Sequence, residues 1–409
     1  MSSIAKHIPE RVFNETLASF LSPVQHLLDD AAVSEILING HEEVYCERGG
    51  QLHLTDVEFG TVSDLEGLCQ NLAQYVGKTV SAEHPFLEGR LPDGSRVSIV
   101  IPPVARRGIT VSIRRFARHR LRTDELVHKG SVTQEVLDFI RGCLLSKRNI
   151  VVAGGTGSGK TTLLNVLSSF FPDDERIIVM EDVSELQVQK EHVVYLETRP
   201  KDGRGKGEAT MRDLLRAVLR LRPDRIIVGE IRGGEAIELV QALSTGHGGS
   251  MTTLHANHAI DAMHRLETMC MMSDIQLPVG PLRAQIISAI DVVVQQNRLR
   301  DGSRRVVGVY EAEGLGAQGE YVMRPLFEFR QRGEEPGTGR VLGELVATEQ
   351  FEASELVQQL PDGGPRVVGI PISFDRERPQ SARPAPKLGE HTAEVLGDAT
   401  RRLADVVER

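Results

Sequence analysis

The chain has 409 residues, of which 40% are hydrophobic, and its 48 basic and 57 acidic residues give a formal net charge of -9 at pH 7. This length accommodates about two or three domains, and the acidic balance excludes a protein whose whole surface attracts nucleic acid. The four cysteines, Cys46, Cys69, Cys143 and Cys270, form no C-x-x-C pair. We expect them to be buried thiols in a reducing cytoplasm rather than disulfides or metal ligands.

The start of the chain lacks an apolar signal core, and no run of about 18 apolar residues occurs. We therefore expect a cytoplasmic protein that reaches a membrane only through a partner. Residues 1–30 are predicted to be an N-terminal helical segment, because apolar residues between 10 and 30 return to one side at helical spacing. Pro23 is expected to divide this segment into two pieces.

Residues 31–115 have the pattern of a separate α+β domain. Short β-branched or apolar runs at 35–40, 43–46, 52–54 and 109–113 predict strands, and 90–100 predicts a turn between two more. One helix is expected at about 62–76. The arginine-rich stretch that follows predicts a linker over 116–130.

The second domain is predicted over residues 131–330. Residues 124–148 have helical spacing, and strands and helices then alternate from 149 to about 310, which is typical of a parallel sheet covered by helices. After that the sequence becomes rich in glycine, glutamate and proline. Residues 331–409 are therefore expected to form a partly disordered C-terminal extension.

The strongest motif is GGTGSGKT at residues 154–161, a complete phosphate loop of the form G-x-x-x-x-G-K-[ST] between a strand-like and a helix-like segment. Glycines allow backbone N–H groups to surround phosphates, and the N-terminus of the following helix favours negative charge. We expect Lys160 to contact the β- and γ-phosphates of ATP or GTP and the Thr161 hydroxyl to bind Mg²⁺. The residues assigned to the nucleotide are Gly155, Thr156, Gly157, Ser158, Gly159, Lys160, Thr161 and Thr162.

Two apolar strands after the phosphate loop end in acids, Glu181 and Asp182 on the first and Glu230 on the second. Carboxylates at the carboxyl ends of parallel strands point into the ligand crevice. Gly229 stands where a Walker B strand usually has aspartate, which favours orientation of a water by Glu230 over direct ligation of the metal. The candidate metal-binding residues are Thr161, Glu181 and Glu230.

Two histidines, His247 and His255, flank another short strand and could bond a γ-phosphate. A zinc site is the alternative, although these histidines do not form H-E-x-x-H and have no cysteine nearby. Arg199 lies in a polar loop, where Pro200 holds it extended.

Together, the loop at 154–161, the acids Glu181 and Asp182, the segment 222–232 and the histidine segment 245–257 resemble the type II/type IV secretion ATPases. Segments 90–96, 113–116, 196–200, 220–236 and 288–295 look most like the Tad/Flp pilus assembly ATPases. The resemblance covers about 31–330. It implies an α/β fold in which a RecA-like phosphate-loop ATPase domain with a parallel-rich sheet follows a smaller, PAS-like α+β domain.

The resemblance further implies a homohexameric ring that hydrolyses ATP with Mg²⁺ to power pilus assembly or protein secretion. Its partners would be inner-membrane platform proteins, and it would be peripheral to that membrane, with no direct contact to nucleic acid. The alternatives are a conjugation-type traffic ATPase for DNA or protein transfer, and a nucleotide-dependent scaffold or regulator of secretion machinery.

Residue roles in such a ring also follow from the resemblance. Glu230 would position or activate water, Glu181 and Asp182 would act on metal and water, and His247 and His255 would sense the γ-phosphate. Arginines would neutralise charge that develops on the transferred phosphoryl group. The candidates for this role are Arg90, Arg96, Arg114 and Arg115 from the N-terminal domain, and Arg199 from its loop.

Overall fold

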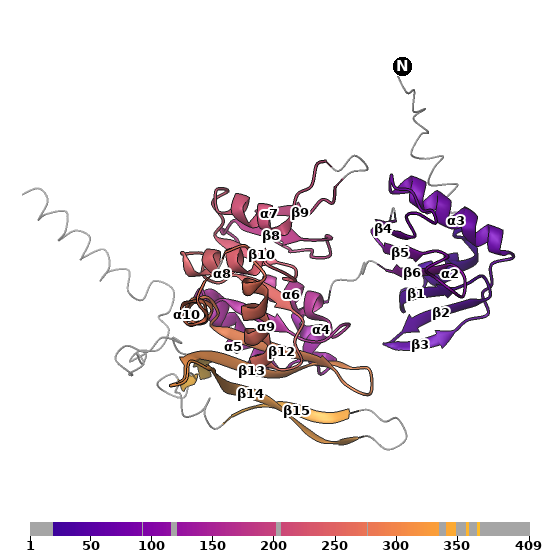
Figure 1. The fold of residues 1–409 in the computed structure, drawn as a ribbon. Helices are drawn as coiled ribbons and strands as arrows, with labels where there is room; N and C mark the ends of the chain where they lie inside the picture. The colour runs from indigo at the N-terminus through magenta and orange to yellow at the C-terminus, as the bar shows by residue number, and fades with distance from the viewer. Residues whose placement is uncertain are drawn as a thin grey trace, which may run out of the picture. The chain divides into compact units, whose positions relative to one another are not determined.

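The computed structural model describes residues 19–91, 93–115, 121–201, 206–275, 277–334, 341–348, 357–359 and 366–368. Contacts divide the chain into two compact units (Figure 1). The first contains the described residues up to Arg122 together with Arg199–Ala209 and Arg298–Arg304, and the second contains the rest. None of the described helices combines the length and apolar character needed to cross a bilayer.

A six-stranded antiparallel sheet with the order β3-β2-β1-β6-β5-β4 forms the first unit. Successive side chains of a strand point to opposite faces, and residues such as Ile36, Val111 and Ile113 are buried together with those of helix α3 (Val62–Tyr75). The strands are β1 (Val33–Asn39), β2 (Glu43–Arg48), β3 (Gln51–Leu54), β4 (Phe86–Arg90), β5 (Arg96–Val100) and β6 (Thr110–Arg114).

Local sequence signals explain several boundaries in the first unit. The predicted helix at 62–76 is α3, and the Thr61 side chain caps it by accepting the Asp64 N–H. The strands predicted on either side are also confirmed. Of the predicted helical segment, residues 1–18 lie outside the described part, and Pro23 occupies the first turn of the short helix η1 (Ser22–Val24), which α2 (Gln25–Asp29) follows.

A nine-stranded mixed sheet forms the second unit, in the order β15-β14-β13-β12-β7-β11-β10-β8-β9. The strands from β12 to β9 in this order run parallel, whereas β13, β14 and β15 pair antiparallel. The parallel strands are β7 (Ile150–Ala153), β8 (Ile177–Glu181), β9 (Val193–Glu197), β10 (Arg225–Val228), β11 (Met251–Leu254) and β12 (Val292–Arg298). The antiparallel strands are β13 (Arg304–Leu315), β14 (Tyr321–Glu334) and β15 (Val341–Ala347).

Helices α7 (Met211–Val218), α8 (Ala236–Ser244), α9 (Ala259–Met271) and α10 (Val279–Ala289) cover one face of this sheet (Figure 1). Their apolar residues form a single core with strand residues such as Val151, Ile178 and Ile226. Helix α6 (Lys160–Ser168) follows β7 directly after the phosphate loop. This arrangement brings the carboxyl ends of the six parallel strands to one edge of the sheet.

The helical pattern at 124–148 corresponds to two helices, α4 (Thr123–His128) and α5 (Gln134–Leu145), rather than one. Gly130 has φ 66, a left-handed conformation that ends α4, and the Thr133 side chain caps α5. Part of the predicted linker at 116–130 is therefore helical. The predicted extension at 331–409 begins inside β14. The end of that strand pairs with β15, so the start of the extension belongs to the sheet.

The last described elements are β16 (Val357–Gln359) and β17 (Arg366–Val368), which pair antiparallel. All four cysteines are buried as free thiols, as predicted. They include Cys46 in β2 and Cys69 in α3, whose side chains belong to the core of the first unit.

Candidate functional site

The phosphate loop connects β7 to α6. Gly157 has φ 69 and Gly159 has φ 92, conformations that side chains disfavour. A Cβ on Gly154 would lie 2.1 Å from the Gln296 carbonyl oxygen and 2.6 Å from Ser158 Oγ. Glycine is therefore required where the end of β12 approaches the loop. Because Gly159 directly precedes α6, the first N–H groups of the helix, which have no acceptor within the helix itself, are directed toward the loop, where they can bind phosphate oxygens.

Lys160 is the first residue of α6 and is buried, with 8% of its surface exposed. Its Nζ donates to the carbonyl oxygens of Gly154 at 3.1 Å and Gly155 at 2.9 Å. The same Nζ lies 3.5 Å from Nδ1 of His255, which follows β11. The ammonium group is thus directed into the loop, where it can bind phosphate.

A carboxylate continues this line of polar groups. Nε2 of His255 lies 3.0 Å from Oε1 of Glu230, which follows β10. Burial lowers the pKa of His255, and the positive charge of Lys160 lowers it further. In the neutral tautomer that fits these contacts, Nε2–H donates to Glu230 and Nδ1 accepts from Lys160. Lys160, His255 and Glu230 therefore form one hydrogen-bonded series from the phosphate loop to the acid.

Glu181, the last residue of β8, is buried, with 4% of its surface exposed. Its Oε1 accepts the backbone N–H groups of Glu185 at 2.8 Å and Leu186 at 2.9 Å. Burial raises the pKa of Glu181 to about 7, although these two donors act in the opposite direction. This oxygen therefore already accepts two backbone hydrogen bonds. The structure favours Asp182 and Glu230 over Glu181 as the acids that could bind a metal.

The side chain of Glu181 also explains why glycine occupies position 229. A Cβ at position 229 would lie 2.9 Å from Cγ of Glu181. The departure from the usual Walker B aspartate is thus coupled to the buried glutamate on the neighbouring strand.

Arg232 was not among the residues predicted for the site. Its Nη2 donates to Oε2 of Glu230 at 2.7 Å, and its Nη1 lies 3.7 Å from Oδ2 of Asp182. The hydrogen bond to Glu230 is the main cause that raises the pKa of Arg232. The sequence signal for Arg232 was its place two residues after the acid, within the segment 222–232 that carries the family resemblance.

Gln295 is a second residue that was not predicted for the site. It lies in β12 and is buried, with 3% of its surface exposed. Its Nε2 donates to the carbonyl oxygen of Ala256 at 3.1 Å, directly after His255. A polar residue within an apolar strand was the signal that could have found it.

The structure separates His247 from His255. His247 precedes β11 and its Nδ1 lies 3.1 Å from the carbonyl oxygen of Ala242, near the end of α8. His255 follows the other end of β11 and contacts Lys160. The two histidines thus lie at opposite ends of β11, and the role of His247 toward a γ-phosphate stays a prediction.

Three of the predicted arginines form a row in the first unit. Arg90 in β4 lies opposite Arg96 in β5, which lies opposite Arg114 in β6. Residues directly opposite each other share a sheet face, and their neighbours in sequence Val97 and Ile113 face the core. Like charges in such positions are unfavourable by themselves, and Glu35 in β1, directly opposite Arg114, offsets part of that repulsion.

The other two predicted arginines contact the backbone. Nη1 of Arg115 donates to the carbonyl oxygens of Asp30 and Val33, the latter at 3.0 Å. This contact holds the beginning of β1 in place, so Arg115 has a structural role. Nε of Arg199 donates to the carbonyl oxygen of Gly207 within its own loop.

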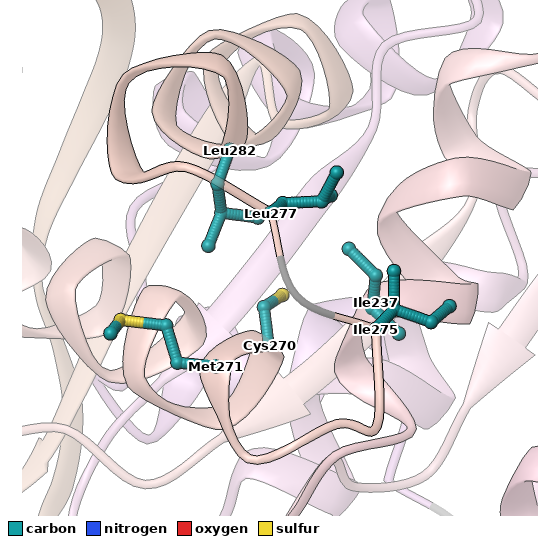
Figure 2. Close-up of a pocket in the computed structure, with 6 residues that line it drawn as sticks. All are labelled: Ile237, Cys270, Met271, Ile275, Leu277 and Leu282. Atoms are coloured by element: carbon teal, nitrogen blue, oxygen red, sulfur yellow. The ribbon is translucent and has the colours of Figure 1, made fainter.

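A separate pocket of about 250 Å³ lies in the second unit (Figure 2). Its lining is apolar apart from one thiol and contains none of the predicted site residues. The lining residues are Ile237, Cys270, Met271, Ile275, Leu277 and Leu282. Because these side chains offer no charge to a phosphate, the pocket is distinct from the phosphate-loop site.

Comparison with known proteins matches residues 18–319 to the family described as "Type II/IV secretion system protein". The type IV secretion system protein PtlH of Bordetella pertussis is 36% identical over 312 residues, covering 70% of this chain and 92% of that protein. The conjugal transfer protein TrbB of Rhizobium radiobacter is 36% identical over 292 residues, covering 70% of this chain and 86% of that protein.

Among solved structures, the ATPase DotB of Yersinia pseudotuberculosis is similar with a TM-score of 0.51 and 16% identity. The match covers 74% of this chain and 79% of that chain. At this identity the similarity concerns the fold alone. It confirms the predicted α/β fold class.

Proposed function

Because this chain belongs to the type II/IV secretion system protein family, we propose that it hydrolyses ATP to drive a secretion or pilus machine. The observation that carries this proposal is the series from Lys160 through His255 to Glu230 at the edge of the parallel sheet. It joins a phosphate-binding lysine to an acid that can orient water, as hydrolysis of a phosphoanhydride requires.

Each side chain of the site has a separate role in this proposal. Lys160 and the backbone N–H groups of residues 155–160 bind the phosphates. Glu230 orients the attacking water and accepts its proton. His255 lies between these two groups, so that it can transmit the presence of the γ-phosphate to the acid. Gln295 supports His255 through the carbonyl oxygen of Ala256.

A divalent cation fits the donor set near the loop. The hydroxyl of Thr161 lies in the first turn of α6, and Asp182 and Glu230 provide carboxylate oxygens, the ligand type that Mg²⁺ prefers. These residues would hold the ion. Bound Mg²⁺ would neutralise charge on the β- and γ-phosphate oxygens.

At a finer level, we propose a homohexameric motor of the Tad/Flp pilus assembly type that acts through an inner-membrane platform protein. The resemblance of segments 196–200, 220–236 and 288–295 supports this subtype. The names of PtlH and TrbB support a second candidate, a traffic ATPase for type IV secretion or conjugation. Deleting the gene and measuring surface pili and conjugative transfer in the same strain distinguishes the two.

The ATPase proposal is tested with purified wild type, Lys160→Ala and Glu230→Gln. We expect Lys160→Ala to lose both ATP binding and hydrolysis. Glu230→Gln should still bind ATP but lose on the order of 10²-fold or more in turnover, because it cannot accept a proton. Phosphate release and binding of a fluorescent ATP analogue report these effects.

Lys147→Ala is the matched control, since Lys147 pairs with Glu175 rather than with the phosphate loop. It should hydrolyse ATP at the wild-type rate. Unchanged turnover in Lys160→Ala would refute the assignment.

A further inference from the structure

Two acids follow adjacent strands at the same level of the sheet. Met180 in β8 pairs with Val228 in β10 in parallel register, and Asp182 and Glu230 each follow two residues later. Carboxylates held side by side repel each other. A cation between them removes this repulsion, and Arg232 contacts both, at 2.7 Å to Glu230 and 3.7 Å to Asp182.

The backbone that carries Arg232 is held in place. Oε1 of Glu235 accepts the N–H groups of Arg232 at 2.9 Å and Gly233 at 3.0 Å. On the other side, the Ile231 N–H donates to the carbonyl oxygen of Thr253 at 3.2 Å, in β11. The guanidinium therefore starts from a defined point beside β10 and β11.

Stability alone does not explain this arrangement. The Arg232 side chain is 58% exposed, and ion pairs of exposed side chains contribute little to folding. The contacts of Arg232 instead restrain the carboxylate of Glu230. Arg232 contacts Oε2 of Glu230 while His255 contacts Oε1, so both oxygens have a partner.

We propose that Arg232 is a positioning residue that fixes the orientation of the Glu230 carboxylate for water activation. The terminal torsion of a glutamate is broad, and contacts to both oxygens restrict it. A carboxylate has about four lone-pair sites, so two remain for a water molecule. The inference rests on the proposed ATPase function and adds a residue to its machinery.

The test compares ATP turnover of Arg232→Ala, Arg232→Lys and the control Arg216→Ala. Arg216 is 59% exposed and bonds Oε1 of Glu238 at 2.9 Å, and that acid keeps Arg212 as a partner after the substitution. We expect Arg232→Ala to lose roughly 10- to 100-fold in kcat, with little change in KM for ATP. Arg232→Lys should recover part of the loss, because it keeps the charge without the planar fork.

A double variant with Glu230→Gln separates positioning from a general structural effect. If Arg232 acts through Glu230, the double variant should be no slower than Glu230→Gln alone. Arg216→Ala should equal the wild type, and thermal melts establish that each variant is folded. If Arg232→Ala does not fold, Arg232→Lys carries the same comparison.

Two results would overturn the inference: a kcat of Arg232→Ala equal to that of the wild type, or losses that multiply in the double variant. Absence of ATP hydrolysis by the wild type would instead refute the proposed function. The two failures are therefore distinguishable.

Discussion

Lys160, His255 and Glu230 come from three separate segments but form one hydrogen-bonded series at the residue scale. Each follows a different parallel strand, and each side chain has a partner that restrains it. Burial and Lys160 lower the pKa of His255 and so favour the neutral imidazole, in which one ring nitrogen donates to Glu230 and the other accepts from Lys160. Glu181 lies beside this series with a different role, because its oxygen binds backbone N–H groups.

Glu181→Gln should make the stability of the protein less dependent on pH. Burial raises the pKa of Glu181 from an ordinary value of 4.5 to about 7. As pH rises between these values, the unfolded carboxyl ionises while the folded one stays protonated. The stability linked to this group is therefore complete below the lower value and is lost as pH approaches 7.

The loss should reach about 3 kcal/mol at most. Glutamine cannot ionise, but its amide oxygen can still accept the N–H groups of Glu185 and Leu186. Urea unfolding of both proteins at about pH 5 and about pH 8 measures the difference. An equal pH dependence of the two unfolding free energies would contradict the buried, protonated state of Glu181.

Arg225, at the start of β10, links several elements at the edge of the sheet opposite the site. Its side chain is fully buried and pairs with Glu175. It also donates to the carbonyl oxygens of Leu144 at 2.7 Å and Gly249 at 3.0 Å. One side chain thus joins the end of α5, the start of β10 and the loop before β11. Helix α5 precedes β7 in the chain, and β11 pairs with β7 in the sheet.

Arg225→Met should lower the free energy of unfolding by about 3 kcal/mol, because it leaves two carbonyl oxygens without a donor and leaves the partly buried Glu175 carboxylate with Lys147 as its remaining cation. Lys147→Ala removes another partner of Glu175, but Lys147 is 48% exposed. That control should cost less than about 1 kcal/mol. Chemical denaturation measures both losses of unfolding free energy. Similar losses in the two variants would show that the burial of Arg225 does not determine its contribution to stability.

The whole molecule distributes its predicted site residues over two compact units. The first carries the row of Arg90, Arg96 and Arg114, and the second carries the phosphate loop with its acids. We propose that assembly brings an arginine row of one subunit to the phosphate loop of another. Charge that develops on a transferred phosphoryl group would then be neutralised only in the oligomer.

Mixing two inactive variants tests this proposal. Lys160→Ala and Arg114→Ala should each hydrolyse ATP poorly, and their mixture should recover part of the activity. In mixed rings, some sites would combine an intact phosphate loop with an intact arginine. The wild type should also gain specific activity as its concentration rises and rings form.

The control mixture pairs Lys160→Ala with Glu230→Gln. Both substitutions damage the second unit, so no mixed site is complete and no recovery is expected. If the arginine acts within its own chain, the first mixture should also remain inactive.

The phosphate loop, helix α3 and the acids at the strand ends could be predicted from the sequence. These features depend on short-range patterns: glycine spacing, apolar periodicity and the residue that ends a strand. The split between α4 and α5 was also encoded locally, at Gly130 and Thr133, although the helical periodicity on both sides obscured it.

Only the tertiary structure decided which of these residues meet. Strand order placed His255 beside Lys160 and left His247 at the other end of β11. Register aligned Arg90, Arg96 and Arg114, and it brought Arg232 between Asp182 and Glu230. The physical reason is that pairing between distant strands depends on packing of the whole sheet, whereas a phosphate loop needs only its own backbone and the helix that follows it.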